Sequence, residues 1–187
     1  FWQVIAVIGL ITGVILLLFI NIYKPFEPQR PEPKMISKSN DIYNPGEIGN
    51  ILGDKDAKLI IKEYTDYQCP FCVISNRNML KLSKDVDDIM IVHYDFPLDS
   101  ECNPKVRRSM HPDACKAIYY AKAARKQGKF WDMSTLLYNN KDNLSDENIL
   151  RLAKSIDLDV NKLQKDVKEN KEKFKKEILR DIEKAER

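Results

Sequence analysis

Apolar residues are distributed very unevenly along the chain. The first 23 positions carry no charged side chain, whereas the rest alternates between short apolar runs and densely charged segments. As a helix rising 1.5 Å per residue, this stretch would be roughly 34 Å long, enough to cross a bilayer core of about 30 Å. Trp2 and Tyr23 stand near its two ends, where aromatic belts form. We therefore predict a transmembrane anchor over residues 1–23.

A cleaved signal peptide is the alternative interpretation of this segment. Its apolar core would be shorter, and a small-residue cleavage site would follow, whereas Asn-Ile-Tyr-Lys-Pro follows here at residues 21–25. Gly9 and Gly13 form a GxxxG step, which either marks a helix–helix contact in the membrane or occurs by chance. Because the chain begins with Phe and not Met, we expect further residues upstream.

Residues 24–45 are interpreted as a linker between the anchor and a folded body over residues 46–187. The linker combines prolines with mixed charges, a composition that favours a semi-extended spacer. The first half of the body predicts, in order, a strand over 57–65, a helix over 70–84 and a buried strand over 89–96. This order indicates a parallel β-α-β unit in an α/β fold, with the helix as the crossover.

The second half of the body is predicted to be a block of helices after a loop over 99–110. Proline, serine and aspartate at helix starts, and glycine at a helix end, mark the boundaries. The helices are expected at 112–128, at 129–139, after the cap residue Ser145, after the cap residue Asp159, and at 171–186. The last is amphipathic, with Phe174, Ile178 and Ile182 on one side.

Length and charge narrow the class of protein. A chain of 187 residues holds one ordinary domain plus an appendage, which argues against a multi-domain enzyme and a multi-span transporter. Lys and Arg number 31 and Asp and Glu 28, so the net charge is +3. That balance gives no reason to expect a nucleic-acid partner.

Cys69 and Cys72 enclose Pro70 and Phe71 at the junction of the first strand and the first helix. Unpaired N–H groups and the positive dipole end of a helix favour a thiolate there, so Cys69 is predicted to attack and leave readily in thiol–disulfide exchange. Cys72, one turn further on, is near enough to close a disulfide. Phe71 offers the thiolate neither charge nor hydrogen bond, so we expect a weaker oxidant than a motif with His there.

A zinc site and an inert structural disulfide are the alternative interpretations of the CxxC motif. A four-cysteine zinc site needs a second pair at similar spacing. The remaining cysteines, Cys102 and Cys115, are separated by twelve residues, and His93 and His111 fit no metal pattern. The motif therefore favours redox chemistry that uses no cofactor besides the redox-active disulfide itself.

The stretch EYTDYQCPFC at residues 63–72 resembles the active-site strand and helix start of DsbA-like thiol–disulfide oxidoreductases. Residues 95–98, 111–115 and 127–131 also resemble the branch of that family that is paired or fused with vitamin K epoxide reductase homologues. The similarity runs from about residue 53 to residue 167. It implies a thioredoxin fold with a helical insertion.

In that family an acidic residue six positions before the first cysteine lies buried beneath the disulfide, and Glu63 has this spacing. A buried carboxyl with a raised pKa could accept or return the proton of Cys72. Alternatively, Glu63 is a polar residue on an exposed strand face. Leu59 and Ile61 share its face by strand alternation, which favours burial only weakly because the opposite face is apolar too.

The family also places a cis-proline in a Thr-Pro-like turn opposite the CxxC motif. This chain has no proline after Pro112, and Pro97 ends a strand that is topologically wrong for that role. Without the last strands of the fold, the sheet would expose an unpaired edge. Either the site is degenerate, or the chain is cut short of its final hairpin and helix; we favour the second and expect the protein to continue beyond Arg187.

The second cysteine pair, Cys102 and Cys115, has three interpretations. It is a structural disulfide that closes a loop of about 14 residues and contributes on the order of 3 kcal/mol, a second redox pair that relays electrons, or two free thiols. Two cysteine pairs favour an oxidising compartment, which places the body on the extracytoplasmic side of the cytoplasmic membrane. The basic residues after the anchor favour the opposite orientation; they are Lys24, Arg30, Lys34 and Lys38.

Three functions are consistent with these patterns. The first is a membrane-anchored thiol oxidase of the cell envelope, which oxidises protein thiols and is reoxidised by a quinone-linked membrane partner. The second is a reductase or isomerase fed by a membrane electron donor. The third is a non-catalytic thioredoxin-like subunit of a membrane assembly. The direction of electron flow depends on reduction potential and partner, so the sequence leaves it open.

Overall fold

The computed structural model describes residues 50–186. The predicted anchor over 1–23, its Gly9–Gly13 step and the linker over 24–45 lie outside these residues. Among the helices of the described part, none combines the length and the apolar character that crossing a membrane requires.

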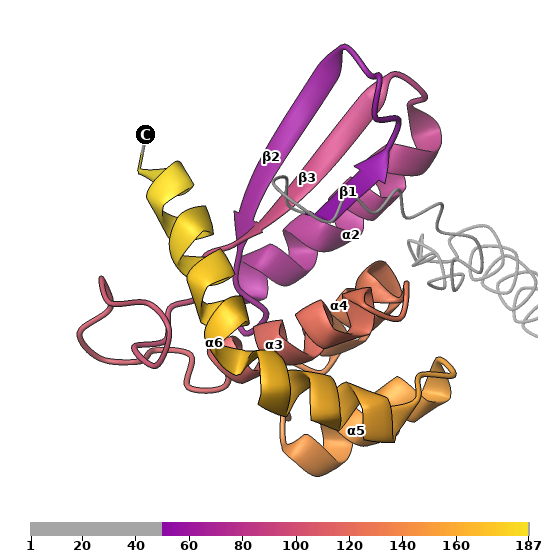
Figure 1. Cartoon of the computed structure of the whole chain (residues 1–187). Helices are drawn as coiled ribbons and strands as arrows, with labels where there is room; N and C mark the ends of the chain where they lie inside the picture. The colour runs from indigo at the N-terminus through magenta and orange to yellow at the C-terminus, as the bar shows by residue number, and fades with distance from the viewer. Residues whose placement is uncertain (1–49, 187) are drawn as a thin grey trace, which may run out of the picture. The chain divides into compact units, whose positions relative to one another are not determined.

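A three-stranded sheet forms the first half of the described chain, in the order β1-β3-β2 (Figure 1). Its strands are β1 (Asn50–Gly53), β2 (Leu59–Thr65) and β3 (Ile89–Asp95), and α2 (Pro70–Asp85) connects the last two. β2 and β3 are parallel, which confirms the predicted β-α-β unit, and β1 runs antiparallel to β3. The central position of β3 explains why all seven of its residues are buried.

β1 was not predicted from the sequence, because its four residues, NILG, give too short a pattern. Its last residue, Gly53, adopts a left-handed φ of 94°. A Cβ at this position would stand 2.3 Å from the carbonyl oxygen of Ile89, so the chain passes close to β3 only because the residue is glycine. β2 begins at Leu59, two residues later than expected.

Four helices gather at the carboxyl ends of β2 and β3 (Figure 1). They are α3 (Ala114–Arg125), α4 (Phe130–Asn139), α5 (Asp146–Ser155) and α6 (Val160–Ala185). The predicted caps are confirmed, since Ser145 accepts from the main-chain N–H of Asn148 and Asp159 from that of Lys162. The prediction of two helices after Asp159 was wrong, because α6 continues without interruption for 26 residues.

Small residues on α3 let the other helices approach it closely. Ala117, Ile118, Ala121 and Ala124 are fully buried. α3 begins at Ala114 and not at Pro112, and Asp113 precedes it without a side-chain capping bond. The helical block therefore packs tightly against the end of the sheet where the CxxC motif lies.

Candidate active site

The CxxC motif lies where β2 ends and α2 begins, as the sequence predicted. Cys69 is the residue before the helix, with extended backbone angles of φ −73° and ψ 121°, and Pro70 takes the first helical position, where its missing N–H is harmless. Both cysteines are partly buried, and both are free thiols in this structure. The motif is therefore in its reduced form at a helix N-terminus.

Cys72 lies in the first turn of α2 and is partly buried. Burial raises the pKa of Cys72 to about 12, against the opposing effect of a backbone hydrogen bond with Asp66. A hydrogen bond with Cys69 raises the pKa further. Cys72 is thus protonated at neutral pH in the reduced form, so opening of a Cys69–Cys72 disulfide must end with a proton on Cys72.

Glu63 is buried on β2 and faces His93 of β3. Glu63 is 7% exposed, and its Oε1 lies 3.4 Å from Nδ1 of His93. Its second oxygen, Oε2, is buried without a hydrogen-bond partner from residues 50–186. A buried carboxyl oxygen without a partner is costly, so Glu63 retains the capacity to accept a proton or a water molecule.

His93 is also buried, and it is held between two carboxylates. Its Nε2 lies 3.3 Å from Oδ1 of Asp95, while Nδ1 faces Glu63. Burial alone would lower the pKa of His93, but hydrogen bonds to Asp95 and Glu63 outweigh it and raise the pKa to about 9. His93 is therefore an imidazolium at neutral pH.

Hydroxyl groups surround this buried pair. Tyr138 donates to Oγ1 of Thr65 at 2.7 Å, and that oxygen lies 3.4 Å from Nδ1 of His93. Burial raises the pKa of Tyr138 well above its usual value, so the phenol keeps its proton. The hydroxyls of Tyr67 and Ser134 form a further hydrogen bond of 2.8 Å.

From Asp95 the buried charges continue into the helical block. Asp95 pairs with Lys122 of α3 at 2.8 Å, and Lys122 lies 3.2 Å from Glu177 of α6. Burial would raise the pKa of Asp95, but the Lys122 ammonium and His93 hold it well below its usual range. Negative and positive groups thus alternate from β2 through β3 and α3 to α6, which compensates their burial.

Asp66, three residues before Cys69, forms hydrogen bonds with the loop between β3 and α3. One carboxylate oxygen accepts from the main chain of Gln68 at 2.7 Å. The other accepts from the main chain of Leu98 at 2.6 Å and faces Nδ1 of His111 at 2.9 Å. These contacts tie the segment between β3 and α3 to the turn that carries Cys69.

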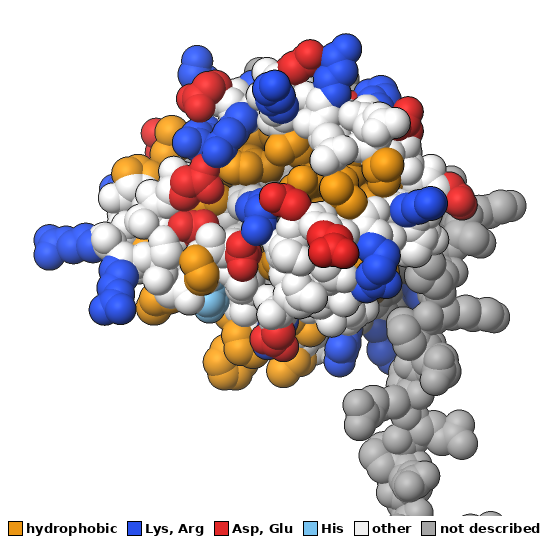
Figure 2. Space-filling view, turned by 90° about the horizontal axis from the view of Figure 1, so that it is seen from below, with side chains coloured by type: hydrophobic (Ala, Val, Ile, Leu, Met, Phe, Trp, Pro, Cys, Tyr) orange, Lys and Arg blue, Asp and Glu red, His pale blue; other side chains and the backbone are white. Residues whose placement is uncertain are grey.

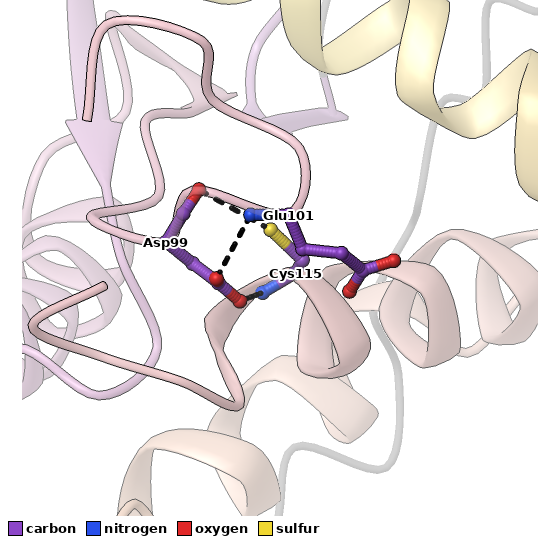
Figure 3. Close-up of side chains that lie close together, drawn as sticks. All are labelled: Asp99, Glu101 and Cys115. Atoms are coloured by element: carbon purple, nitrogen blue, oxygen red, sulfur yellow. Dashed lines mark hydrogen bonds between the residues drawn. The ribbon is translucent and has the colours of Figure 1, made fainter. Parts of the chain in front are cut away.

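The same loop is closed by a disulfide between Cys102 and Cys115, whose Cα atoms are 5.9 Å apart. Asp99 lies beside it and accepts from the main-chain N–H groups of Glu101 and Cys115 (Figure 3). Ligand atoms of Asp99, Glu101 and Cys115 lie within 4.8 Å of one another, as in some metal sites. Because the Cys115 sulfur is bonded to Cys102, this cluster instead fixes the shape of the loop.

Three large apolar side chains near the motif are exposed to solvent. The exposed fractions are 79% for Phe71, 56% for Ile74 and 66% for Met110. Figure 2 shows hydrophobic side chains gathered beside a partly exposed histidine on one rim of the molecule. Exposed apolar side chains of this size beside reactive thiols suit contact with another protein chain.

The sequence located part of this site. Cys69 and Cys72, with Pro70 and Phe71 between them, begin a helix, and Glu63 is buried in the strand before it. The sequence reasoning missed the roles of His93, Asp95, Asp66 and His111. A usable signal was present, since His93 and Asp95 interrupt an otherwise apolar strand.

A CxxC motif that opens the crossover helix of a β-α-β unit defines a thioredoxin-like protein. Residues 60–187 match the family described as the DSBA-like thioredoxin domain, and the chain belongs to that family.

Solved structures of thioredoxin-like proteins share the fold. The thiol-disulfide exchange protein alpha-DsbA2 of Wolbachia pipientis is 21% identical with a TM-score of 0.60, over 72% of this chain and 67% of that one. A thioredoxin-like oxidoreductase of Silicibacter pomeroyi has a TM-score of 0.59 at 21% identity, over 73% and 71%. Oxidised BdbD of Bacillus subtilis has a TM-score of 0.53 at 22% identity, over 70% of both chains.

Curated relatives of this chain are much longer proteins. The Na(+)/H(+) antiporter NhaA 1 of Mycobacterium sp. (strain KMS) is 31% identical over 141 residues, which cover 75% of this chain and 22% of the antiporter. The antiporter NhaA 3 of Salinispora tropica is 30% identical over 115 residues, or 62% and 16%. The chain thus spans about a fifth of the length of these relatives.

Proposed function

We propose that the chain oxidises protein thiols to disulfides through Cys69 and Cys72. One observation carries this proposal: Cys69 stands at the N-terminus of α2, and Cys72 lies one turn further on, where burial raises the pKa of its thiol. The helix N-terminus stabilises negative charge on the first sulfur. The Cys72 thiol keeps its proton at neutral pH. The two sulfurs therefore have different roles: Cys69 exchanges with the substrate, and Cys72 leaves and takes up a proton.

The reaction begins with Cys69 and Cys72 joined in a disulfide. A substrate thiolate attacks the sulfur of Cys69, a new S–S bond forms, and the Cys69–Cys72 bond breaks with its electron pair on Cys72, which takes up a proton. A second substrate thiolate then attacks the substrate sulfur of this mixed disulfide and expels Cys69 as a thiolate. Two substrate thiols are oxidised to one disulfide, and Cys69 and Cys72 are reduced by the same two electrons.

In this proposal Glu63 supplies and removes the proton of Cys72. Its support is the buried position of Glu63 and its Oε2 atom, which has no hydrogen-bond partner within the described residues. A water molecule bridging Oε2 and the thiol would complete the path. Pro70 stiffens the turn between the two cysteines, and the exposed Phe71 contacts the substrate chain.

The cell envelope is the proposed site of action. We propose that residues 1–23 anchor the chain in the cytoplasmic membrane, with the domain on the extracytoplasmic side and a quinone-linked membrane protein as the oxidant. Support comes from the uncharged segment and from the Cys102–Cys115 disulfide, since such bonds persist in oxidising compartments.

The same site can run in the opposite direction, as a disulfide reductase or isomerase fed by a membrane donor. The direction depends on the reduction potential of the pair and on its partner. The redox state in cells separates the two, because an oxidase rests with Cys69 and Cys72 oxidised and a reductase rests with both reduced.

Trapping of the mixed disulfide tests the proposed function. In the Cys72→Ser variant, Cys69 remains but the second thiol that would release a mixed disulfide is gone. We expect this variant to form disulfide-linked complexes with envelope proteins on non-reducing gels, and the Cys69→Ser variant, its matched control, to form none. Equal absence of complexes from both variants would contradict the proposal.

A further inference from the structure

His111 and Asp66 form a carboxylate–imidazole pair beside the CxxC motif, on the side that faces solvent. The His111 side chain is 20% exposed, and its Nδ1 lies 2.9 Å from Oδ2 of Asp66. A carboxylate can only accept a hydrogen bond, so Nδ1 carries the proton. The other ring nitrogen, Nε2, then holds a lone pair in the neutral imidazole. Within residues 50–186, Nε2 makes no hydrogen bond.

Asp66 joins this pair to the reacting cysteines. Its main-chain carbonyl accepts from the N–H of Cys69 at 3.2 Å, and its backbone forms a hydrogen bond with Cys72. The next turn is tied to the same loop, because the side-chain oxygen of Gln68 accepts from the N–H of Asp113 at 2.7 Å. His111 therefore packs against the turn that leads directly into Cys69.

The loop that carries His111 is fixed at several points. The N–H groups of Met110 and His111 both donate to the carbonyl of Leu98, at 3.0 and 3.2 Å. The Cys102–Cys115 disulfide closes the loop around them. Such a framework holds the imidazole in one orientation, as an acid–base group requires.

Two acidic residues near the loop, Asp113 and Asp99, are paired elsewhere. Asp113 forms an ion pair with Lys116 at 2.7 Å at the start of α3. Asp99 accepts from Ser109 and from main-chain N–H groups. In the described part of the chain, Asp66 is the ionisable residue that contacts His111.

We propose that His111, oriented by Asp66, is a catalytic residue that removes the proton from the incoming substrate thiol. This inference rests on the proposed function. Neutral His111 accepts the thiol proton at Nε2, and the resulting substrate thiolate attacks Cys69. The proton remains on His111 until it is released to solvent, while Cys72 receives its own proton from the buried side. In this proposal two residues handle protons during thiol–disulfide exchange: the partly exposed His111 and the buried Glu63.

The rate acceleration expected from His111 depends on how much of the substrate thiol is already ionised. A thiol with a pKa of about 8.5 is roughly 3% ionised at pH 7, so a base can accelerate the attack by at most about 30-fold there. At pH 9 and above most of the thiol is already ionised, and the advantage disappears. Loss of His111 should therefore matter at neutral pH and not in alkali.

His111→Asn is the sharpest variant, because its side-chain amide can keep the hydrogen bond to Asp66 while the proton acceptor Nε2 is lost. The full chain, with Cys69 and Cys72 oxidised, is mixed with a reduced peptide containing two cysteines, and the loss of peptide thiols is timed from pH 5.5 to 9.5. We expect a loss of about tenfold at pH 7 that vanishes near pH 9. Lys116→Gln, a change at the adjoining end of α3, is the control and should follow the wild type.

A second measurement distinguishes a catalytic role of His111 from a structural role in its loop. Imidazole added to His111→Ala should restore part of the rate at pH 7, whereas a structural defect would not respond. An unchanged pH profile in His111→Asn, or an equal loss at every pH without rescue, overturns the role of His111. A wild-type chain that oxidises no peptide thiols at any pH overturns the proposed function itself.

Discussion

The side chains of Glu63 and His93 meet in the interior although they stand on different strands. The parallel register sets Glu63 opposite His93, and Oε1 and Nδ1 are 3.4 Å apart. Because the pKa of His93 is about 9, the acid behind the CxxC motif faces a positive charge at neutral pH. In the proposed proton path through Glu63, the protonation of Cys72 is therefore linked to the charge of His93 on β3.

Replacement of His93 by Gln should change how stability depends on pH. The folded-state pKa of about 9 lies above the ordinary value of 6.5, so the charged His93 stabilises the fold fully below pH 6.5. This contribution is lost as the pH rises through 9. Urea unfolding of the wild type should show a falling free energy of unfolding between these values, with a shallower fall in His93→Gln. Identical slopes would contradict a protonated His93.

Asp181 on α6 is predicted to cost stability at neutral pH. Burial, and then the negative charge of Asp95, raise its pKa to about 6. A raised carboxyl pKa means that the contribution of Asp181 is most favourable in acid and is lost as the pH rises through 6. The uncharged Asp181→Asn keeps an acceptor for the N–H of Asp95, 3.3 Å away. At pH 7 the free energy of unfolding of Asp181→Asn should be roughly 1–3 kcal/mol higher than that of the wild type.

The control for Asp181→Asn is Glu183→Gln, which removes an exposed carboxylate two residues further along α6. It should leave the free energy of unfolding nearly unchanged at pH 7. The gain from Asp181→Asn should also disappear near pH 4. A gain that persists in acid would show that the effect comes from packing and not from charge.

Removal of the Cys102–Cys115 disulfide should weaken the fold without stopping the chemistry. The bond spans 13 positions, and closing a loop of that length contributes on the order of 3 kcal/mol in the chain-entropy model. The Cys102→Ala/Cys115→Ala double variant should unfold at lower urea and still form mixed disulfides at Cys69. Loss of peptide oxidation in a variant that remains folded would instead support an electron relay through the second pair.

Glu63→Gln should slow the steps in which Cys72 gains or loses its proton. An acid–base group that is removed costs typically 100-fold or more, but solvent can replace part of its action, so we expect a loss of about tenfold near neutral pH. Lys62→Gln changes the neighbouring exposed residue of β2 and is the control. Single-turnover oxidation of a dithiol peptide measures both. Equal rates for Glu63→Gln and the wild type would remove Glu63 from the proton path.

Much of the fold could be predicted because its signals are local. The CxxC motif with Pro70 and the caps Ser145 and Asp159 each depend on neighbours along the chain. β1 could not be predicted from the sequence, because a segment of four residues forms a strand only through its pairing with β3. α6 was divided in the prediction because its charged middle interrupts the apolar pattern, whereas packing on α3 keeps it continuous.

The candidate site could be predicted less completely, because its contacts join residues that are far apart in the sequence. Burial of Glu63 was predicted partly by alternation with Leu59, yet Leu59 is 53% exposed at the start of β2. Glu63 is buried because the helices cover the carboxyl end of the strand, which alternation cannot indicate. The contacts of Glu63 with His93, and of Asp66 with His111, join segments 30 and 45 positions apart. Only the folded chain brings those pairs together.

The most direct test of the account is the transfer of oxidation from the chain to a substrate. The oxidised full chain is mixed with a reduced peptide that carries two cysteines, and free thiols on both are counted over time. We predict that the peptide loses as many thiols as the chain gains at Cys69 and Cys72, and that Cys69→Ser abolishes the transfer. A peptide that stays reduced with the wild type, or is oxidised equally by Cys69→Ser, would contradict the central role of Cys69.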